Sequence, residues 1–368
     1  MPRLPPSVLI RASRENGLLP ALLKECRTLD SARNELRWLR ERALRDSQSP
    51  SRRAGWRTRL RSMCHRRSRG VPLQYILGDQ PFGDLEILCR PGVLIPRPET
   101  ESYTYQAANL ARQISVEAGL PSNASRGRKC LRVLDLCTGT GCIALLLHAL
   151  LAPRFEELRI LGIDLSPHAM SLARKNLDHN LHLGLLDHRA STDISFHRAD
   201  VLGQNDRSIP SVEEILPQYF PASAASKTVP LGFEVDVLVS NPPYISTSDF
   251  RNGTTARSVR LFEPRLALVP PATVDSEMRT GRPEDIFYHH LLSLSRRAGA
   301  SITVLECGDI KQARRVVDMY NAKVSRGFHA EIWPSSESDL RYYGFHPRDG
   351  SRCVIIRRHT SQEVLKST

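Results

Sequence analysis

The sequence has no long hydrophobic run. No stretch approaches the roughly 18 uninterrupted apolar residues of a membrane-spanning helix, so we expect no membrane span. The eight cysteines form no Cys-x-x-Cys pair and no paired Cys/His zinc spacing, which indicates a reducing compartment and no metal site. His289 and His290 do not alter this expectation, because adjacent residues on a helix face different sides. With 368 residues, 40% apolar and 25% charged, the chain is expected to form two domains.

Acidic residues are scarce in the first 70 positions. Eighteen Lys and Arg stand there against 6 Asp and Glu, a balance of +12, while the other 298 residues carry +1 of the net +13. Such asymmetry indicates an acidic partner, proximity to RNA or ribosomes, or targeting, and a solvated basic face is the plain alternative. The first fourteen residues hold three arginines, two serines and no acid. This composition is typical of a mitochondrial transit signal, and a frayed terminus is the alternative, so we expect a mitochondrial or otherwise a cytoplasmic protein.

The N-terminal part is expected to be helical. Residues 18–46 predict a helix with one apolar face, formed by Ala32, Leu36, Leu39 and Ala43. Residues 47–70 are rich in Ser and Arg and predict a loop followed by a basic helical turn. We therefore place a basic helical domain at 1–70, a candidate for binding an acidic partner.

A connector follows at 71–101. Two apolar runs, 85–89 and 93–95, flank Pro91-Gly92, and this pattern predicts a β-hairpin. The connector leads into the main domain, which we place at 102–368.

Strands and helices alternate from residue 131 onward. The expected strands are 131–136, 158–164, 194–197, 235–240, 301–306, 328–333 and 353–358. The expected helices are 141–151, 166–180, 284–297 and 309–321. This alternation predicts an α/β fold with a mostly parallel sheet and helices on both faces. Residues 203–233, rich in Pro and Ser, interrupt the pattern and are expected to form a surface insertion.

A glycine-rich turn follows the first strand of this domain. The run from Val133 to Gly141 is a buried strand that ends in a turn and opens a helix. A ligand can approach the glycine backbone, and the free N–H groups of the helix N-terminus can attract an anionic group. The candidate cofactor-binding residues are Asp135, Cys137, Thr138, Gly139, Thr140 and Gly141. A phosphate-binding P-loop is excluded because no Lys-Ser/Thr follows the last glycine, although the spacing to Ala144 also satisfies a dinucleotide fingerprint.

Two aspartates follow the next strands. Asp164 ends the second strand, 23 residues after Gly141, where a carboxylate can accept both hydroxyls of a ribose. Asp200, followed by Val201, comes after the third strand, where an adenine edge could be reached. Either aspartate could instead cap a loop.

The motif Asn241-Pro242-Pro243-Tyr244 follows the fourth strand. Two prolines stiffen the turn and supply carbonyls without neighbouring N–H donors. A planar amide or amino nitrogen can be held between the Asn241 side-chain oxygen and the Pro242 carbonyl, and Tyr244 can pack on the planar group. An ordinary proline turn is the alternative, but the C-terminal end of a sheet strand is where α/β enzymes bind ligands.

Together, the glycine turn, Asp164 and residues 241–244 resemble the class I S-adenosylmethionine-dependent methyltransferases that modify a planar nitrogen. Further motifs resemble the subfamily that methylates glutamine N5 of peptide chain release factors. These motifs are 72–78, Phe82-Gly83, 94–101, 259–264 with Ala267-Leu268, and 305–308. The resemblance spans about residues 20–358. The basic helical start and the transit-like first residues make the chain similar to the mitochondrial members.

Three features depart from the family pattern. Cys137 stands where many members have a glycine, so the backbone there is expected to suit a residue with a Cβ. Residues 198–201 lack the aromatic residue that some family members place beside the adenine of the cofactor. The 203–233 insertion has no counterpart in the bacterial members. None of these departures removes a group that methyl transfer needs.

The resemblance implies a Rossmann-like methyltransferase domain with a seven-stranded sheet, S-adenosyl-L-methionine as the cofactor, and a class I release factor as the substrate. The implied catalytic residues are Asn241, Pro242, Pro243 and Tyr244. The implied cofactor-binding residues are Asp135, Cys137, Thr138, Gly139, Thr140, Gly141, Asp164, Asp200, Val201 and Asn241. The implied substrate-binding residues are Asn241, Pro242, Tyr244, Arg97 and Glu99. We expect a monomer without metal or nucleic acid.

Two other functions remain open at this point. A nucleic-acid adenine-N6 methyltransferase shares the motif at 241–244 and would account for the basic N-terminus. A non-catalytic RNA- or ribosome-binding protein on a methyltransferase fold is the second alternative. A dehydrogenase function has weaker support, because no acid–base pair for hydride transfer accompanies the glycine turn.

Overall fold

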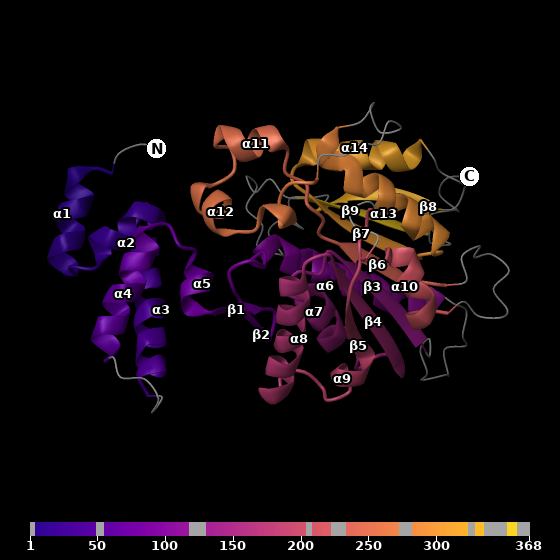
Figure 1. Ribbon diagram of the computed structural model, residues 1–368, viewed down its shortest axis with the longest axis horizontal. Helices are drawn as coiled ribbons and strands as arrows, with labels where there is room; N and C mark the ends of the chain where they lie inside the picture. The colour runs from indigo at the N-terminus through magenta and orange to yellow at the C-terminus, as the bar shows by residue number, and fades with distance from the viewer. Residues whose placement is uncertain are drawn as a thin grey trace.

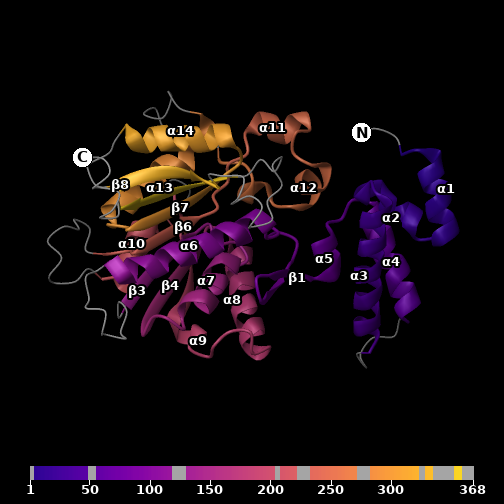
Figure 2. The same ribbon diagram turned by 180° about the vertical axis from the view of Figure 1, so that it is seen from behind.

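The computed structural model describes residues 4–48, 55–117, 130–203, 208–221, 233–271, 282–322, 328–334 and 352–358. Figures 1 and 2 show a group of N-terminal helices at one end, a narrow connector, and a larger α/β body at the other end. The N-terminal helices are α1 (Pro6–Glu15), α2 (Leu19–Cys26), α3 (Leu29–Ser47), α4 (Trp56–Ser68) and α5 (Leu73–Leu77).

The single helix expected over 18–46 is in fact two helices. Arg27 adopts a left-handed φ of 66°, which ends α2, and the Thr28 side chain then accepts the Ser31 N–H as the cap of α3. The predicted apolar face is confirmed, since Ala32, Leu39 and Ala43 are fully buried and Leu36 packs beside them. The basic turn expected before residue 70 is a thirteen-residue helix, α4, while residues 49–54 of the expected loop lie outside the described residues.

Helix α1 packs onto the same core. Its Ala12 is fully buried, and its Glu15 forms an ion pair of 2.6 Å with Arg33 of α3. Leu73 and Ile76 of α5 belong to this core as well. The helical core therefore extends past residue 70, the expected boundary, into the connector.

The connector contains a hairpin, but not around the expected turn. Strands β1 (Asp79–Phe82) and β2 (Leu85–Leu88) pair antiparallel about Gly83 and Asp84. Gly83 has a φ of 57°, and a Cβ there would lie 2.7 Å from Leu146, so the turn needs glycine. Pro91-Gly92 forms a later turn that leads to α6 (Pro98–Glu117).

The body is built on a seven-stranded sheet, which confirms the predicted architecture. Its strands are β3 (Cys130–Leu136), β4 (Glu157–Asp164), β5 (Ile194–Arg198), β6 (Val237–Ser240), β7 (Ile302–Cys307), β8 (Phe328–Trp333) and β9 (Arg352–Arg358). The order is β5-β4-β3-β6-β7-β9-β8. Every pairing is parallel except those of β9 with β7 and with β8.

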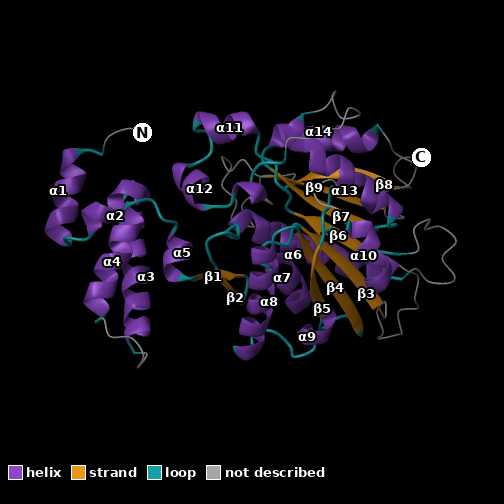
Figure 3. Cartoon of the chain, viewed as in Figure 1, coloured by secondary structure: helices purple, strands orange, loops and turns teal. Residues whose placement is uncertain are grey.

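Helices cover both faces of this sheet (Figure 3). The remaining helices of the body are α7 (Cys142–Leu151), α8 (Pro167–His182), α9 (Ala190–Asp193), α10 (Val212–Tyr219), α11 (Thr247–Asn252), α12 (Arg257–Phe262), α13 (Ile286–Arg297) and α14 (Ile310–Asn321), with the 3-10 turns Arg265–Ala267 and Pro283–Asp285. Helices α6, α7 and α8 share one core with alternate strand residues, and α10, α13 and α14 share the other. The strands are apolar on both sides because both faces are covered.

The segment expected as a surface insertion contains part of the core. Helix α10 lies within 203–233, begins with a capping box at Ser211 and Glu214, and buries Val212 and Leu216 completely. This part differs from the long surface loop expected there, while residues 204–207 and 222–232 lie outside the described residues. Within the described chain, no helix is both long and apolar enough to cross a membrane.

Candidate active site

The candidate residues meet at the carboxyl edge of the sheet between β3 and β6. The two strands are parallel neighbours, with Leu136 paired to Ser240, and the Ser240 hydroxyl donates to the Leu136 carbonyl at 2.8 Å. Cys137 and Asn241, the next residues on each strand, therefore start adjacent loops. The chain leaves β3 toward β4 on one side, while β6 lies on the other, and such a switch in strand order is where open α/β sheets bind ligands.

The glycine turn has three residues in the left-handed region. The φ angles are 61° for Cys137, 56° for Gly139 and 81° for Gly141. The expectation that the backbone at 137 suits a Cβ is therefore wrong, because L side chains rarely adopt this conformation. A Cβ at Gly139 would meet only the Cys137 carbonyl, at 4.0 Å, whereas one at Gly141 would lie 2.9 Å from Phe196. Gly139 thus faces open space, and Gly141 allows close internal packing.

The amide groups of this turn are directed into the protein. The Thr138 N–H donates to the Ile163 carbonyl at 3.0 Å, and the Gly139 N–H donates to the Asp164 carboxylate at 3.0 Å. The Gly141 N–H donates to the Thr138 carbonyl at 2.8 Å. The N–H groups of the turn are therefore engaged at these three positions, whereas the free N–H groups expected at the helix N-terminus belong to α7, which begins at Cys142, and stay a prediction.

Asp135 and Asp164 are the acidic groups next to the turn. Burial raises the pKa of Asp135 to about 7, and the hydrogen bond from the Thr138 hydroxyl opposes this shift. The other Asp135 oxygen is buried and has no hydrogen-bond partner among the described residues. Burial also raises the pKa of Asp164, against the N–H groups of Ser166 and Gly139 that its carboxylate accepts.

Asp200 lies after β5, as expected, but its side chain forms a hydrogen bond within the same turn. It is 3% exposed, and its carboxylate accepts the Leu202 N–H at 2.9 Å. Val201 is half-buried and packs on the α10 side of the sheet. A contact of either residue with adenine stays a prediction.

Tyr244 is fixed from three directions. Its hydroxyl donates to Glu306 Oε1 at 3.0 Å, and its carbonyl accepts from Gln312 Nε2 at 3.3 Å. Its ring lies against Gly308, where an added Cβ would approach the ring to 3.0 Å. The tyrosine of the proline corner is thus immobilised by residues of β7 and α14.

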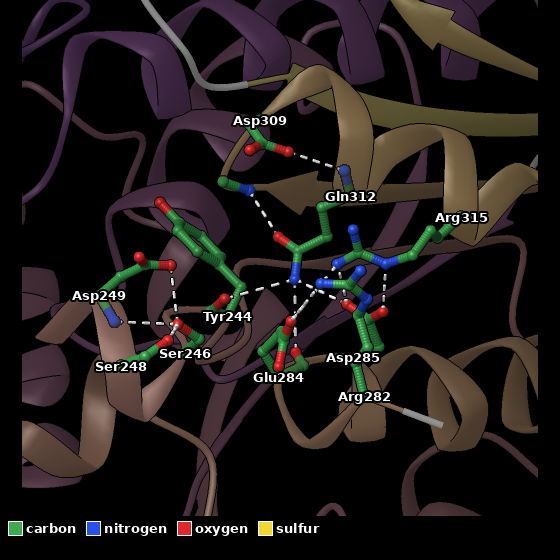
Figure 4. A network of polar contacts seen from close by, with 11 residues as sticks. Tyr244, Ser246, Ser248, Asp249, Arg282, Glu284, Asp285, Asp309, Gln312 and Arg315 are labelled. Carbon is green, nitrogen blue, oxygen red and sulfur yellow. Dashed lines mark hydrogen bonds and ion pairs between the residues drawn. The ribbon is translucent and has the colours of Figure 1, made fainter. Parts of the chain in front are cut away.

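Gln312 is the centre of the network shown in Figure 4. Its side-chain oxygen accepts the Gly308 N–H at 2.8 Å, and its nitrogen donates to Asp285 at 2.9 Å. Asp285 in turn accepts two hydrogen bonds from Arg315, at 2.6 and 2.9 Å. This buried amide ties the proline corner to α13 and α14.

A second set of contacts links Asn241 to the connector. Asn241 Nδ2 lies 3.4 Å from the Thr100 hydroxyl, and Thr100 donates to Glu306 Oε2 at 2.8 Å. Thr100 belongs to the first turn of α6, so the helix that leaves the connector reaches the proline corner directly.

Arg97 and Glu99, the expected substrate-binding residues of the connector, lie at the start of α6. Arg97 forms an ion pair of 2.7 Å with Glu263, whose other oxygen accepts the Ile95 N–H at 3.2 Å. The Arg97 guanidinium is therefore engaged within the protein, while Glu99 is half-buried in the first helical turn. Both predicted roles stay predictions.

Arg97 also lines a groove of about 570 Å³ between the helical domain and the body. The groove is lined by Trp38, Arg42 and Arg45 of α3, by α5 and β1, and by Pro96, Pro98 and Glu101. Trp38 is 41% exposed. Among the described residues, no cluster of three or more His, Cys, Asp or Glu could hold a metal ion.

Curated relatives identify the family. The Saccharomyces cerevisiae protein named mitochondrial MRF1 N(5)-glutamine methyltransferase MTQ1 is 36% identical over 270 residues, which cover 73% of this chain and 68% of that protein. The Schizosaccharomyces pombe protein named probable MRF1 mitochondrial N(5)-glutamine methyltransferase mtq1 is 32% identical, over 87% of this chain and 90% of its own. A Chlorobaculum tepidum release factor glutamine methyltransferase is 35% identical over 58% of this chain and 57% of its own. The chain belongs to the release factor glutamine methyltransferase family.

Two further comparisons add little to this identification. Among solved structures, the N-terminal domain of human METTL16 aligns with 81% of this methyltransferase and 82% of its own chain. The identity is 14% and the TM-score 0.44, which carries no argument about function. No family model matches the chain.

Thr100, Glu306, Gln312 and Glu263 were given no role by sequence reasoning, although three of them lie in motifs that carry the family resemblance. Glu306 had the clearest signal, because it is the one charged residue of a buried strand, Ile302–Cys307. A buried carboxylate needs hydrogen-bond donors, but the sequence does not say which residues supply them. Thr100 and Tyr244, 206 and 62 residues away, supply them here.

The left-handed backbone at Cys137 yields a test by paired substitution. Cys137→Gly and Cys137→Ala both remove the sulfur, so their difference reports the backbone conformation alone. We expect the glycine variant to be the more stable by about 1 kcal/mol in urea unfolding, because φ of 61° penalises any Cβ. At an ordinary position alanine would be favoured, so greater stability of Cys137→Ala contradicts the assignment.

Proposed function

We propose that this methyltransferase transfers a methyl group from S-adenosyl-L-methionine to the side-chain amide nitrogen, N5, of the glutamine in the Gly-Gly-Gln loop of a class I release factor. The observation that carries the proposal is the placement of Asn241 beside the glycine turn, with its amide nitrogen toward Thr100. In that orientation Asn241 Oδ1 is available as an acceptor for a substrate N–H. Membership of the glutamine methyltransferase family supports the same substrate group.

The residues at the edge of the sheet fit a cofactor of this kind. Gly139 offers open space for close approach to the backbone, and Asp164, at the end of β4, would accept ribose hydroxyls. Asp135 holds a buried oxygen without a hydrogen-bond partner among the described residues, which suits a cationic ammonium group. When bound, the cofactor supplies an electrophilic methyl group on a positively charged sulfur.

The chain itself contributes position and hydrogen-bond acceptors. An amide nitrogen is a poor nucleophile because its lone pair is delocalised, so it must be held in line with the methyl carbon at about 3–3.5 Å. The Asn241 oxygen and the Pro242 carbonyl accept its two N–H groups and stabilise the positive charge that develops on nitrogen. Tyr244 packs against the planar amide, and its own ring is held in place by Glu306, Gly308 and Gln312.

Mass spectrometry of a release factor after incubation with enzyme and S-adenosylmethionine tests the proposal. We expect one added methyl group on the glutamine of the Gly-Gly-Gln peptide, and none when that glutamine is replaced. DNA and RNA, run in parallel with labelled cofactor, should remain unlabelled. Label in nucleic acid with an unmodified release factor would establish the adenine-N6 alternative.

Asn241→Ala should separate catalysis from cofactor binding. Loss of the acceptor should lower kcat by roughly a hundredfold or more, by analogy with removal of one oxyanion-hole donor. The dissociation constant of S-adenosylmethionine, measured by calorimetry, should change less than about threefold. A threefold change is a far smaller free energy of binding than the loss of one charged contact would cost. Equal losses in rate and cofactor affinity would instead make Asn241 a cofactor ligand.

We infer that the N-terminal helical domain and the connector hold the body of the release factor. Four of the six acids in residues 1–70, Glu15, Asp30, Glu35 and Asp46, are already paired with arginines of the same domain. The positive excess therefore persists on the surface, and helix α4 exposes Arg57, Arg61 and Arg66. The groove beside Trp38 adds an exposed aromatic and arginines, which are enriched in protein interfaces.

Charge reversal on α4 tests this domain without cutting its core, whereas truncation at residue 70 would expose Leu73 and Ile76. Arg61→Glu with Arg66→Glu should raise KM for the intact release factor about tenfold and weaken its salt dependence. The rate at saturating factor should stay the same. The matched control reverses two exposed cations of the body, Arg154 and Lys175. Equal effects of both pairs would show a general charge effect and contradict a specific docking role.

We propose a mitochondrial location, supported by the names of the two yeast relatives and by the basic, acid-free first fourteen residues.

A further inference from the structure

We propose that Thr100 and Glu306 are positioning residues that fix which end of the Asn241 carboxamide faces the substrate. This inference rests on the proposed function, because it assigns the orientation of the acceptor that holds the glutamine amide. Neither residue touches the reacting atoms in this assignment.

The three side chains form a directed chain of hydrogen bonds. Glu306 Oε2 accepts from the Thr100 hydroxyl at 2.8 Å, and the Thr100 oxygen lies 3.4 Å from Asn241 Nδ2. A carboxylate can only accept, so it orients the single proton of Thr100 toward itself. The Thr100 oxygen then has only lone pairs to offer to Asn241. In a hydrogen bond with Asn241 it can therefore act only as the acceptor.

The consequence is a defined orientation of the Asn241 amide. If its oxygen faced Thr100 instead, two acceptors would oppose each other, because the hydroxyl proton is already given to Glu306. The nitrogen therefore faces Thr100 and the oxygen faces the other way. The contact of 3.4 Å is long, and catalytic hydrogen bonds of this kind commonly tighten when the substrate is bound.

Glu306 also controls the other end of the proline corner. Its Oε1 accepts the Tyr244 hydroxyl at 3.0 Å, so one carboxylate orients both the asparagine and the tyrosine of the motif. Thr100 and Glu306 are 2% and 1% exposed, so water does not compete for these hydrogen bonds. Burial raises the pKa of Glu306, and the Thr100, Tyr103 and Tyr244 hydroxyls oppose that shift by stabilising the charged form.

Helix α6 offers a matched pair of threonines for the test. Thr100→Val removes the hydroxyl that joins Glu306 to Asn241, and Thr100→Ser keeps it. Thr104→Val removes a buried hydroxyl one turn later, which donates to the Thr100 carbonyl at 2.6 Å. All three variants are made in the full chain, and their thermal midpoints are compared first.

We expect Thr100→Val to lower kcat on the release factor by roughly ten- to a hundredfold, the range that a misplaced reacting group costs. The dissociation constant of S-adenosylmethionine should not change. The kcat values of Thr100→Ser and Thr104→Val should both stay within about threefold of the parent value, because these substitutions leave the orienting hydrogen bonds in place. A similar loss of kcat in Thr104→Val, or no rescue by serine, would overturn the proposal in favour of a purely structural role for the helix.

The second measurement does not depend on the substrate. In protein labelled with ¹⁵N at asparagine, Asn241 should show side-chain N–H protons that exchange slowly in the parent and in Thr100→Ser, and rapidly in Thr100→Val. Unchanged exchange in Thr100→Val would overturn the proposal. If the parent enzyme does not methylate a release factor at all, the proposed function fails, while the exchange data still decide whether Thr100 orients Asn241.

Discussion

The parallel pairing of β3 with β6 is the constraint on which the site depends. It places the loop after Leu136 and the loop after Ser240 at the same edge of the sheet, and the Ser240 hydroxyl locks the two strand ends together. The glycine turn and the proline corner come from segments about a hundred residues apart, yet they start side by side. A transfer reaction between two bound groups needs this proximity more than it needs an acid or a base.

The direction of the backbone amides decides what kind of ligand the glycine turn suits. In a phosphate-binding turn the N–H groups point outward to the anion. Here the N–H groups of Thr138, Gly139 and Gly141 are satisfied inside the protein, one of them by the Asp164 carboxylate. These three N–H groups are therefore not free to bind a phosphate group.

The connector is a structural part of the active site as well as a link between domains. Its Arg97 pairs with Glu263 beyond the proline corner, and its Thr100 reaches both Asn241 and Glu306. Figure 1 shows the helical domain attached through this same segment.

The sequence by itself determined the sheet, its strands and the two motifs at its edge, because apolar periodicity and turn residues act over a few neighbouring positions. Predictions from the sequence were wrong where alternative local conformations compete. Examples are the break at Arg27, the hairpin at Gly83 and the helix within 203–233. Only the tertiary structure decided the partners of the buried polar groups. Glu306 and Thr100 meet across 206 residues, and the inward amides of the glycine turn depend on β4. Such pairings follow from which strand ends become neighbours after folding, and no local pattern in the chain encodes that.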